Sequence, residues 1–166
     1  MTIGISFSDI KEGLKSFKGV QRRFNKIFSY NGIDFYDDYA HHPTEIKVVL
    51  DGVNRVYKNY HKICIFQPHR ISRIKDLRKE FSYAFKNSDT VILCPIYAAG
   101  EKIKLGFDYL KFAREIIKNS RVKLFLVNDK NQLARFIKKN VYGKKIVIGM
   151  GAGSISNWMR QLPQLI

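Results

Sequence analysis

Cysteine is scarce in this sequence, which has only two cysteines among 166 residues. Both of them, Cys64 and Cys94, stand inside short apolar stretches of the kind that form buried strands. A buried free cysteine packs as a small apolar residue, and structural disulfides belong mainly to oxidising compartments. We therefore expect two reduced thiols in the core of a cytoplasmic protein, and neither a disulfide framework nor a reactive thiol.

Several other signals are missing as well. No apolar run reaches about 18 residues, so no membrane-spanning helix is expected, and residues 1–6 lack the basic and apolar regions of a secretory signal. Metal-ligand spacings such as Cys-x-x-Cys are absent, and the neighbouring side chains of His41 and His42 diverge, so we expect no metal site. The pattern G-x-x-x-x-G-K-S/T is also absent, which removes the usual means of holding the β- and γ-phosphates of a nucleotide.

Acidic residues are few: 14 Asp and Glu stand against 30 Lys and Arg, which gives a net charge of +16. Such a chain is suited to bind nucleic acid, an anionic membrane surface or phosphorylated ligands. The basic residues are spread along the whole chain, however, without a block of like charge or an aromatic and basic RNA-binding pattern. A solvated, lysine-rich surface is the favoured interpretation, and a basic nucleic-acid-binding module is kept as an alternative.

The rest of the sequence alternates short apolar runs with amphipathic stretches. Asn31-Gly32 lies between two β-prone runs and predicts a hairpin, because a type I′ turn needs positive φ at both central residues. Further strands are predicted at 62–67, 90–96, 122–127 and 145–150, and helices at 8–17, 44–57, 75–85, 107–118, 130–139 and 154–161. Strands that are apolar throughout are buried on both faces. The sequence therefore predicts an α/β fold: an open, doubly wound, mostly parallel, Rossmann-like sheet with an N-terminal antiparallel hairpin.

Polar clusters follow several of these strands, at the edge where such sheets bind ligands. The segment 37–42 holds two carboxylates, a phenol and two imidazoles, and Asp38 is suited to accept hydrogen bonds from ribose hydroxyls. Arg70 and Arg73 share the next loop, and arginine holds carboxylate or phosphate through paired N–H donors. The residues alone favour a ligand site and an ordinary surface (a helix-capping turn and two solvated arginines) about equally. Gly151-Ala152-Gly153 is interpreted as a tight turn between a strand and a helix.

Taken in order, five segments of the chain resemble the Mur ligase family, and the resemblance covers nearly its whole length. The second and third of them are the most specific. They are Phe-Lys-Gly-Val-Gln-Arg-Arg-Phe at 17–24, Asp-Asp-Tyr-Ala-His-His-Pro-Thr-Glu at 37–45, Phe-Gln-Pro-His-Arg-Ile-Ser-Arg at 66–73, Tyr-Ala-Ala-Gly-Glu at 97–101 and Gly-Ala-Gly-Ser-Ile at 151–155.

The resemblance implies an ATP-dependent, amide-forming ligase of three domains. Residues 1–22 would be the end of the central ATPase domain and the hinge, and residues 23–166 the C-terminal domain. The implied branch uses ATP and Mg²⁺ to join L-alanine to UDP-N-acetylmuramate in peptidoglycan precursor synthesis, through an acyl phosphate. A branch that adds a tripeptide during wall recycling is the alternative. The chain alone is expected to be inactive, because the remaining ligase domains hold the P-loop and the UDP-sugar.

The family's residue roles map onto six positions of this sequence. Arg23 and Asp38 would contact the nucleotide, the first at the hinge and the second at the ribose hydroxyls. The L-alanine pocket would be formed by Tyr39, His41, Arg70 and Arg73, with the two arginines on the alanine carboxylate. No catalytic residue is expected in this domain, which would act by orienting alanine and excluding water. Ser154 stands where the family is expected to have Asp, so no polar role is assigned to it.

Overall fold

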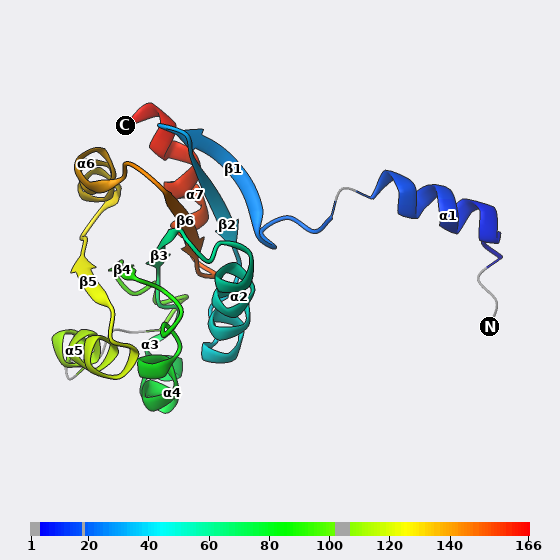
Figure 1. The fold of residues 1–166 in the computed structure, drawn as a ribbon. Coiled ribbons are helices and arrows are strands. Elements are labelled where there is room, and N and C mark those ends of the chain that lie inside the picture. Colours follow the sequence, from blue (N-terminus) through cyan, green and yellow to red (C-terminus); the bar gives the residue numbers. More distant parts are fainter. Residues whose placement is uncertain (1–3, 18, 102–106) are drawn as a thin grey trace.

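A computed structural model describes residues 4–17, 19–101 and 107–166. Within these residues a six-stranded sheet has the strand order β1-β2-β6-β3-β4-β5 (Figure 1). β1 is antiparallel to β2, and every other neighbouring pair is parallel. The predicted open, mostly parallel sheet with an initial hairpin is confirmed. The strands are β1 (Asn25–Tyr30), β2 (Ile33–Asp38), β3 (His61–Phe66), β4 (Thr90–Leu93), β5 (Lys123–Leu126) and β6 (Lys145–Met150).

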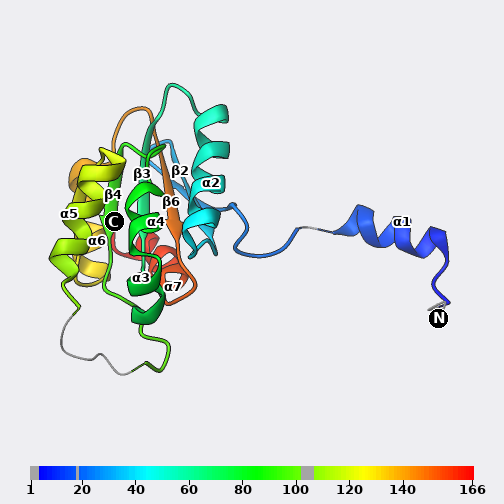
Figure 2. The same ribbon diagram turned by 90° about the horizontal axis from the view of Figure 1, so that it is seen from below.

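Helices cover both faces of this sheet and bury two apolar clusters against it (Figures 1 and 2). One face carries α2 (Pro43–Val56), α3 (Ile71–Asp76), α4 (Arg78–Tyr83) and α5 (Tyr109–Ser120). The other face carries α6 (Lys130–Asn140), α7 (Ile155–Gln161) and the short 3-10 helix η1 (Leu162–Gln164). Cys64 lies in the first cluster and Cys94 in the second, and both are buried and free, as the sequence predicts.

Two elements differ from the predicted ranges for local reasons. The helix predicted over 75–85 is a pair of short helices, α3 and α4, and Leu77 between them leaves helical geometry with φ −112° and ψ 25°. The strand predicted over 90–96 ends at Leu93. Pro95 follows closely and has no N–H for a strand ladder, which explains the early end.

The helix α1 (Phe7–Ser16) stands apart from the sheet and its covering helices (Figures 1 and 2). Ser6 and Asp9 form a capping box at its start, but none of its residues is buried. Phe7 and Leu14 expose 82% and 69% of their surface, so the apolar face of α1 is left uncovered. Residues 1–3 and 18 of the predicted segment 1–22 lie outside the described residues, and its assignment to a central domain stays a prediction. No helix in the described ranges is long and apolar enough to cross a bilayer.

Candidate functional site

The residues predicted to bind ligands gather at one edge of the sheet, beyond the carboxyl ends of β2 and β3. Asp38 ends β2, and Tyr39 and His41 follow it directly. Arg70 and Arg73 stand at the start of α3, just after β3. Arg23 lies at the same edge, because the antiparallel register pairs Asn25 of β1 with Asp37 of β2. The strand order therefore brings to one edge residues that are up to 50 positions apart.

Four aromatic rings, those of Tyr39, His41, His69 and Tyr97, form a row along this edge. The ring centroids of Tyr39 and His41 are 5.1 Å apart, and those of His41 and His69 are 5.7 Å apart. The rings of His69 and Tyr97 are stacked at 5.5 Å with an interplanar angle of 19°. This ring row joins the loop after β2 to the loop after β3, although β6 lies between the two strands.

The two arginines of the next loop stand differently relative to the ring row. Nη1 of Arg73 lies 3.2 Å from Nδ1 of His69 and donates to the His69 carbonyl oxygen at 3.3 Å. The guanidinium of Arg73 is thus held beside the rings. Arg70 has an exposed side chain and a left-handed backbone with φ 67°, and its N–H donates to the Tyr97 carbonyl at 2.9 Å.

The start of α2 fixes the loop that carries Tyr39 and His41. Oε2 of Glu45 accepts the N–H groups of His41 at 2.9 Å and His42 at 3.1 Å. His42 is the N-cap of α2, and its Nδ1 accepts the N–H of Thr44 at 3.3 Å. Burial raises the pKa of Glu45, but the two backbone donors and the nearby charges of His41 and Arg23 together hold the pKa below its usual value. The capping function weighed for this loop is therefore present, and it is performed by His42 and not by an aspartate.

Asp38 is buried and already fully engaged with the backbone. Its Oδ2 accepts the N–H of Phe24 at 2.8 Å, and its Oδ1 accepts the N–H of Ala40 at 2.7 Å. Burial raises the pKa of this carboxyl group, and the two backbone donors offset only part of that effect. In this structure Asp38 ties the segment before β1 to the loop after β2. The ribose contact stays a prediction. Each carboxylate oxygen of Asp38 already accepts one backbone N–H and is buried, so a ribose hydroxyl would have to reach the remaining lone pair of one of them.

Arg23 is exposed, and only its backbone N–H is bonded nearby, to Oδ1 of Asn25 at 2.8 Å. Its charge lies close enough to Asp38 and Glu45 to lower the pKa of both carboxyl groups. The Arg23 guanidinium forms no ion pair among the described residues.

The sequence interpretation missed a buried ionic cluster formed by Asp37, Arg22, Arg160 and Ser156. Asp37 is 0% exposed, and its Oδ2 accepts the hydroxyl of Ser156 at 2.5 Å. The same oxygen lies 3.7 Å from Nε of Arg22 and 3.6 Å from Nη2 of Arg160. One signal was available: β2 places Ile33, Phe35 and Asp37 on the same face, so a carboxylate occupies a core position.

Arg22 also forms the wall of the edge beside the ring row. Its Nη2 donates to the carbonyl oxygen of Gly151, and its guanidinium carbon lies 4.7 Å from the ring centre of Tyr39. The carbonyl oxygen of Arg22 accepts the N–H of Tyr39 at 2.8 Å. Arg22, which the sequence interpretation passed over in favour of its neighbour, thus holds Tyr39 by both its backbone and its side chain.

The glycine turn after β6 leads tightly from that strand into α7, as the sequence interpretation has it. A Cβ at Gly153 would lie 2.5 Å from Cγ of Tyr97 and 2.6 Å from Oε1 of Gln67. The Gln67 side chain closes the turn: Oε1 accepts the N–H of Ile155 at 2.9 Å, and Nε2 donates to the hydroxyl of Ser154 at 3.0 Å. Gly153 lets the turn approach both side chains closely.

We predict that Gly153→Ala lowers the free energy of unfolding by about 1–3 kcal/mol, because the added methyl group overlaps a ring and an amide. The matched control is Gly52→Ala in α2, where nothing lies within 4 Å of an added Cβ. It should raise stability by about 0.5–1 kcal/mol through helix propensity. Urea unfolding of both variants measures the two effects, and equal responses would contradict the packing argument.

We also predict that His69 makes the protein less stable in acid. Burial, together with the charges of Arg73 and His41, lowers the pKa of His69 below its ordinary 6.5. Between that lowered value and 6.5 the unfolded chain binds more protons, so the contribution is complete above 6.5 and is lost as the pH falls. Urea unfolding at several pH values gives the free energy of unfolding as a function of pH. This free energy should fall less steeply with decreasing pH in His69→Gln than in the parent. An unchanged slope would mean that the ring is already solvated like a free histidine.

The sequence model of the family described as "Mur ligase, glutamate ligase domain" matches residues 22–153. The chain belongs to the Mur ligase family. The matched region contains β1 to β6 and the whole edge described above, so the Mur ligase fold positions every predicted site residue.

Relatives within the Mur ligases resemble the chain over almost all of its length. A UDP-N-acetylmuramate–L-alanine ligase from Pelagibacter ubique is 70% identical over 166 residues, which are 100% of this chain and 36% of that protein. One from Brachyspira hyodysenteriae is 43% identical over 92% of this chain and 33% of its own length. The crystal structure of the Thermotoga maritima UDP-N-acetylmuramate–alanine ligase matches with a TM-score of 0.71 and 27% identity, over 97% of this chain and 33% of that one. The chain therefore spans about a third of the length of the relatives that it matches.

Proposed function

We propose that this chain is the C-terminal domain of a ligase that joins L-alanine to UDP-N-acetylmuramate. The observation that carries the proposal is the 70% identity to the Pelagibacter ubique ligase along the entire chain. Tyr39, His41, Arg70 and Arg73 form the alanine pocket of this proposal, and Arg23 and Asp38 meet the nucleotide when the domain closes. In this proposal the domain orients L-alanine and excludes water from the reacting groups, and none of its own side chains takes part in a covalent step.

The geometry beside the ring row supports this alanine pocket. Alanine is a zwitterion, so its carboxylate needs a cationic partner and its amine must stay free to attack the acyl phosphate. Arg73 presents paired N–H donors, and its position against His69 at 3.2 Å is fixed before any ligand arrives. Tyr39 and His41 pack edge to face, and the His41 ring lies 5.7 Å from the ring of His69, against which Arg73 is held. We expect a small amino acid to bind here, with its carboxylate on Arg73.

ATP and Mg²⁺ belong to other parts of the proposed enzyme. No group of three His, Cys, Asp or Glu side chains suited to a metal occurs among the described residues, and the sequence has no P-loop. Among the described residues, those of the candidate edge therefore offer no site for the metal or for the triphosphate. ATP supplies the phosphoryl group that activates the muramate carboxylate, and this chain contributes the nucleophile's binding site. Its closing motion would bring the amine to that carboxylate.

A chimeric enzyme tests the proposal directly. In the Pelagibacter ubique ligase, the 36% of the protein that matches this chain is replaced by the chain itself. ATP-dependent ligation of L-alanine to UDP-N-acetylmuramate should stay within about tenfold of the parent, because a domain folds around its own core and the two sequences are 70% identical. The isolated chain should show no ligation. A folded chimera without activity, or an active isolated chain, would refute the proposal.

A tripeptide-adding ligase is the second candidate, and the same chimera separates the two. The murein peptide ligase of Psychrobacter arcticus matches with a TM-score of 0.73 but only 20% identity, which speaks for a common fold and not for a common substrate. When the chimera is given L-alanine and a tripeptide together, the ratio of the two ligation products shows which substrate it prefers. Exclusive use of the tripeptide would favour this second candidate.

A further inference from the structure

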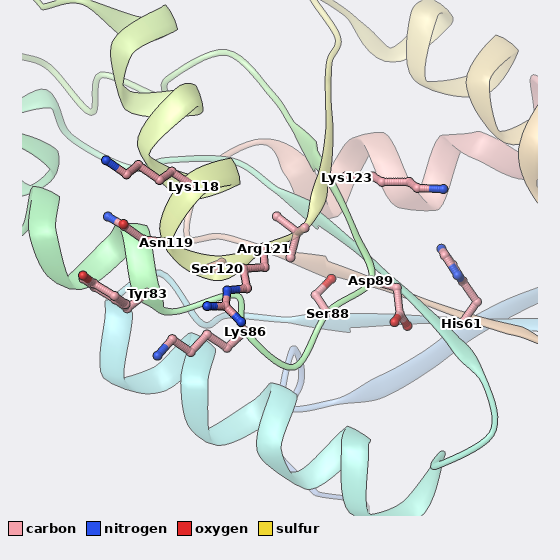
Figure 3. Close-up of a pocket in the computed structure, with 11 residues that line it drawn as sticks. His61, Tyr83, Lys86, Ser88, Asp89, Lys118, Asn119, Ser120, Arg121 and Lys123 are labelled. Carbon is pink, nitrogen blue, oxygen red and sulfur yellow. The ribbon is translucent and has the colours of Figure 1, made fainter.

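A hollow of about 960 Å³ opens at the amino-terminal edge of the sheet, opposite the candidate site (Figure 3). The first residues of β3 and β5, the loop before β4 and the carboxyl ends of α4 and α5 line it. Its volume falls in the range of small-molecule sites, roughly 300–1,000 Å³. No residue of the proposed alanine or nucleotide site contributes to it.

Positive charge dominates the lining. Lys86 follows α4, whereas Lys118, Arg121 and Lys123 come from the end of α5 and the start of β5, and all four side chains are exposed. Throughout the described ranges none of them forms an ion pair. The lining has a single carboxylate, that of Asp89, which accepts the N–H of Lys62 at 2.7 Å and lies 3.6 Å from its Nζ. The four cations therefore have no protein anion to neutralise them.

Two of the neutral polar groups in the hollow, the hydroxyls of Ser88 and Ser120, are already bonded within the protein. The hydroxyl of Ser88 donates to the carbonyl oxygen of Thr90 at 2.8 Å, and that of Ser120 donates to the carbonyl oxygen of Ser82 at 2.7 Å. Recognition in this hollow consequently depends on the cationic groups, and the ligand they favour is an anion.

The arrangement of the cations favours an anion with several charges. Lys86, Lys118 and Arg121 lie toward one end of the hollow, whereas Lys123 lies toward the other (Figure 3). The ammonium of Lys86 also rests 4.9 Å over the ring of Tyr83, which restrains its position. A single carboxylate would meet only one end. Guanidinium and ammonium groups both bind phosphate, the first through paired donors and the second as a point charge.

We propose that this hollow binds a small molecule that carries two or more phosphate groups. Binding would neutralise cations that now repel one another, and Arg121 would hold one phosphate while the lysines meet the next. The proposal stands independently of the ligase assignment, because the two sites lie at opposite edges of the sheet.

Inorganic diphosphate is the probe, titrated into the 166-residue chain by calorimetry at physiological ionic strength. The test variant is Lys86→Gln/Lys118→Gln/Arg121→Gln. The control variant, Arg135→Gln/Lys138→Gln/Lys139→Gln, removes the same number of charges from the exposed side of α6. We expect one saturable site whose affinity falls at least about tenfold in the test variant and less than about twofold in the control. An equal loss in both variants would show diffuse charge attraction and overturn the proposal, as would the absence of saturable binding.

Amide chemical shifts locate the bound diphosphate. The expected shifts lie at Asp89, Arg121 and Lys123, and shifts confined to Arg70 and Arg73 would overturn the proposal. Thermal unfolding checks that both triple variants are folded. If the test variant does not fold, the single change Arg121→Gln replaces it, with an expected loss of about threefold and no loss for Arg135→Gln.

Discussion

In a ligase that carries this chain, replacing Arg73 by alanine raises the KM for L-alanine by roughly 100-fold, while kcat at saturating alanine changes far less. The expected size follows from charge-assisted hydrogen bonds, which contribute about 1.5–3 kcal/mol each. The loss falls on alanine binding because Arg73 contacts no other substrate in the proposed geometry. His69, which now holds the guanidinium at 3.2 Å, cannot replace its charge. Steady-state kinetics of the chimera with varied alanine measures the effect.

Two further variants test whether the effect comes from the paired N–H donors of Arg73, from its charge alone, or from any change on α3. Arg73→Lys keeps the charge but loses the paired donors, so its KM should lie between those of the parent and Arg73→Ala. Lys75→Ala, an exposed change two residues along α3, should leave the KM for alanine unchanged. If Arg73→Ala and Lys75→Ala behave alike, Arg73 does not bind alanine.

The fold could be predicted from the sequence because its signals are local. Asn31-Gly32 forms the expected turn, with φ of 50° and 74°, and the apolar strands lie where their composition indicates. The break between α3 and α4 at Leu77 could not be predicted, because no proline or glycine marks it. Ile74 and Phe81, on either side of the break, are both completely buried.

The candidate site was harder to predict because its contacts are long-range. His41 and His69 meet because β2 and β3 both run parallel to β6, which lies between them, so that the loops after both strands leave the sheet at the same edge. No spacing along the chain encodes this. Motif reasoning also drew attention to Arg23 and Asp38, whose polarity is visible in the sequence. The structure adds that both carboxylate oxygens of Asp38 accept backbone N–H groups, and that the carbonyl oxygen of Arg22 accepts the N–H of Tyr39.

The carboxylate of Asp37 should matter most for stability, and we expect Asp37→Ala to lower the free energy of unfolding by about 3 kcal/mol. The change leaves the Arg22 guanidinium, whose side chain is 22% exposed, without its anion, and leaves the Ser156 hydroxyl without an acceptor. The loss stays at the low end of the range for broken buried pairs because Oδ1 of Asp37 has no hydrogen-bond partner and Arg160 is half exposed.

A neighbouring pair supplies the control for Asp37→Ala. Asp34 lies on the same strand and is 2.6 Å from Lys26, a shorter contact than any in the Asp37 cluster to an arginine. Both side chains of that pair are exposed, by 37% and 51%, so Asp34→Ala should cost less than about 1 kcal/mol. Urea unfolding of Asp37→Ala and Asp34→Ala shows whether the burial of an ion pair or the distance between its charged atoms decides the loss in the free energy of unfolding. A double-mutant cycle with Arg22→Ala isolates the pairwise term, and a coupling near zero would mean that Asp37 acts through Ser156 and Arg160 and not through Arg22.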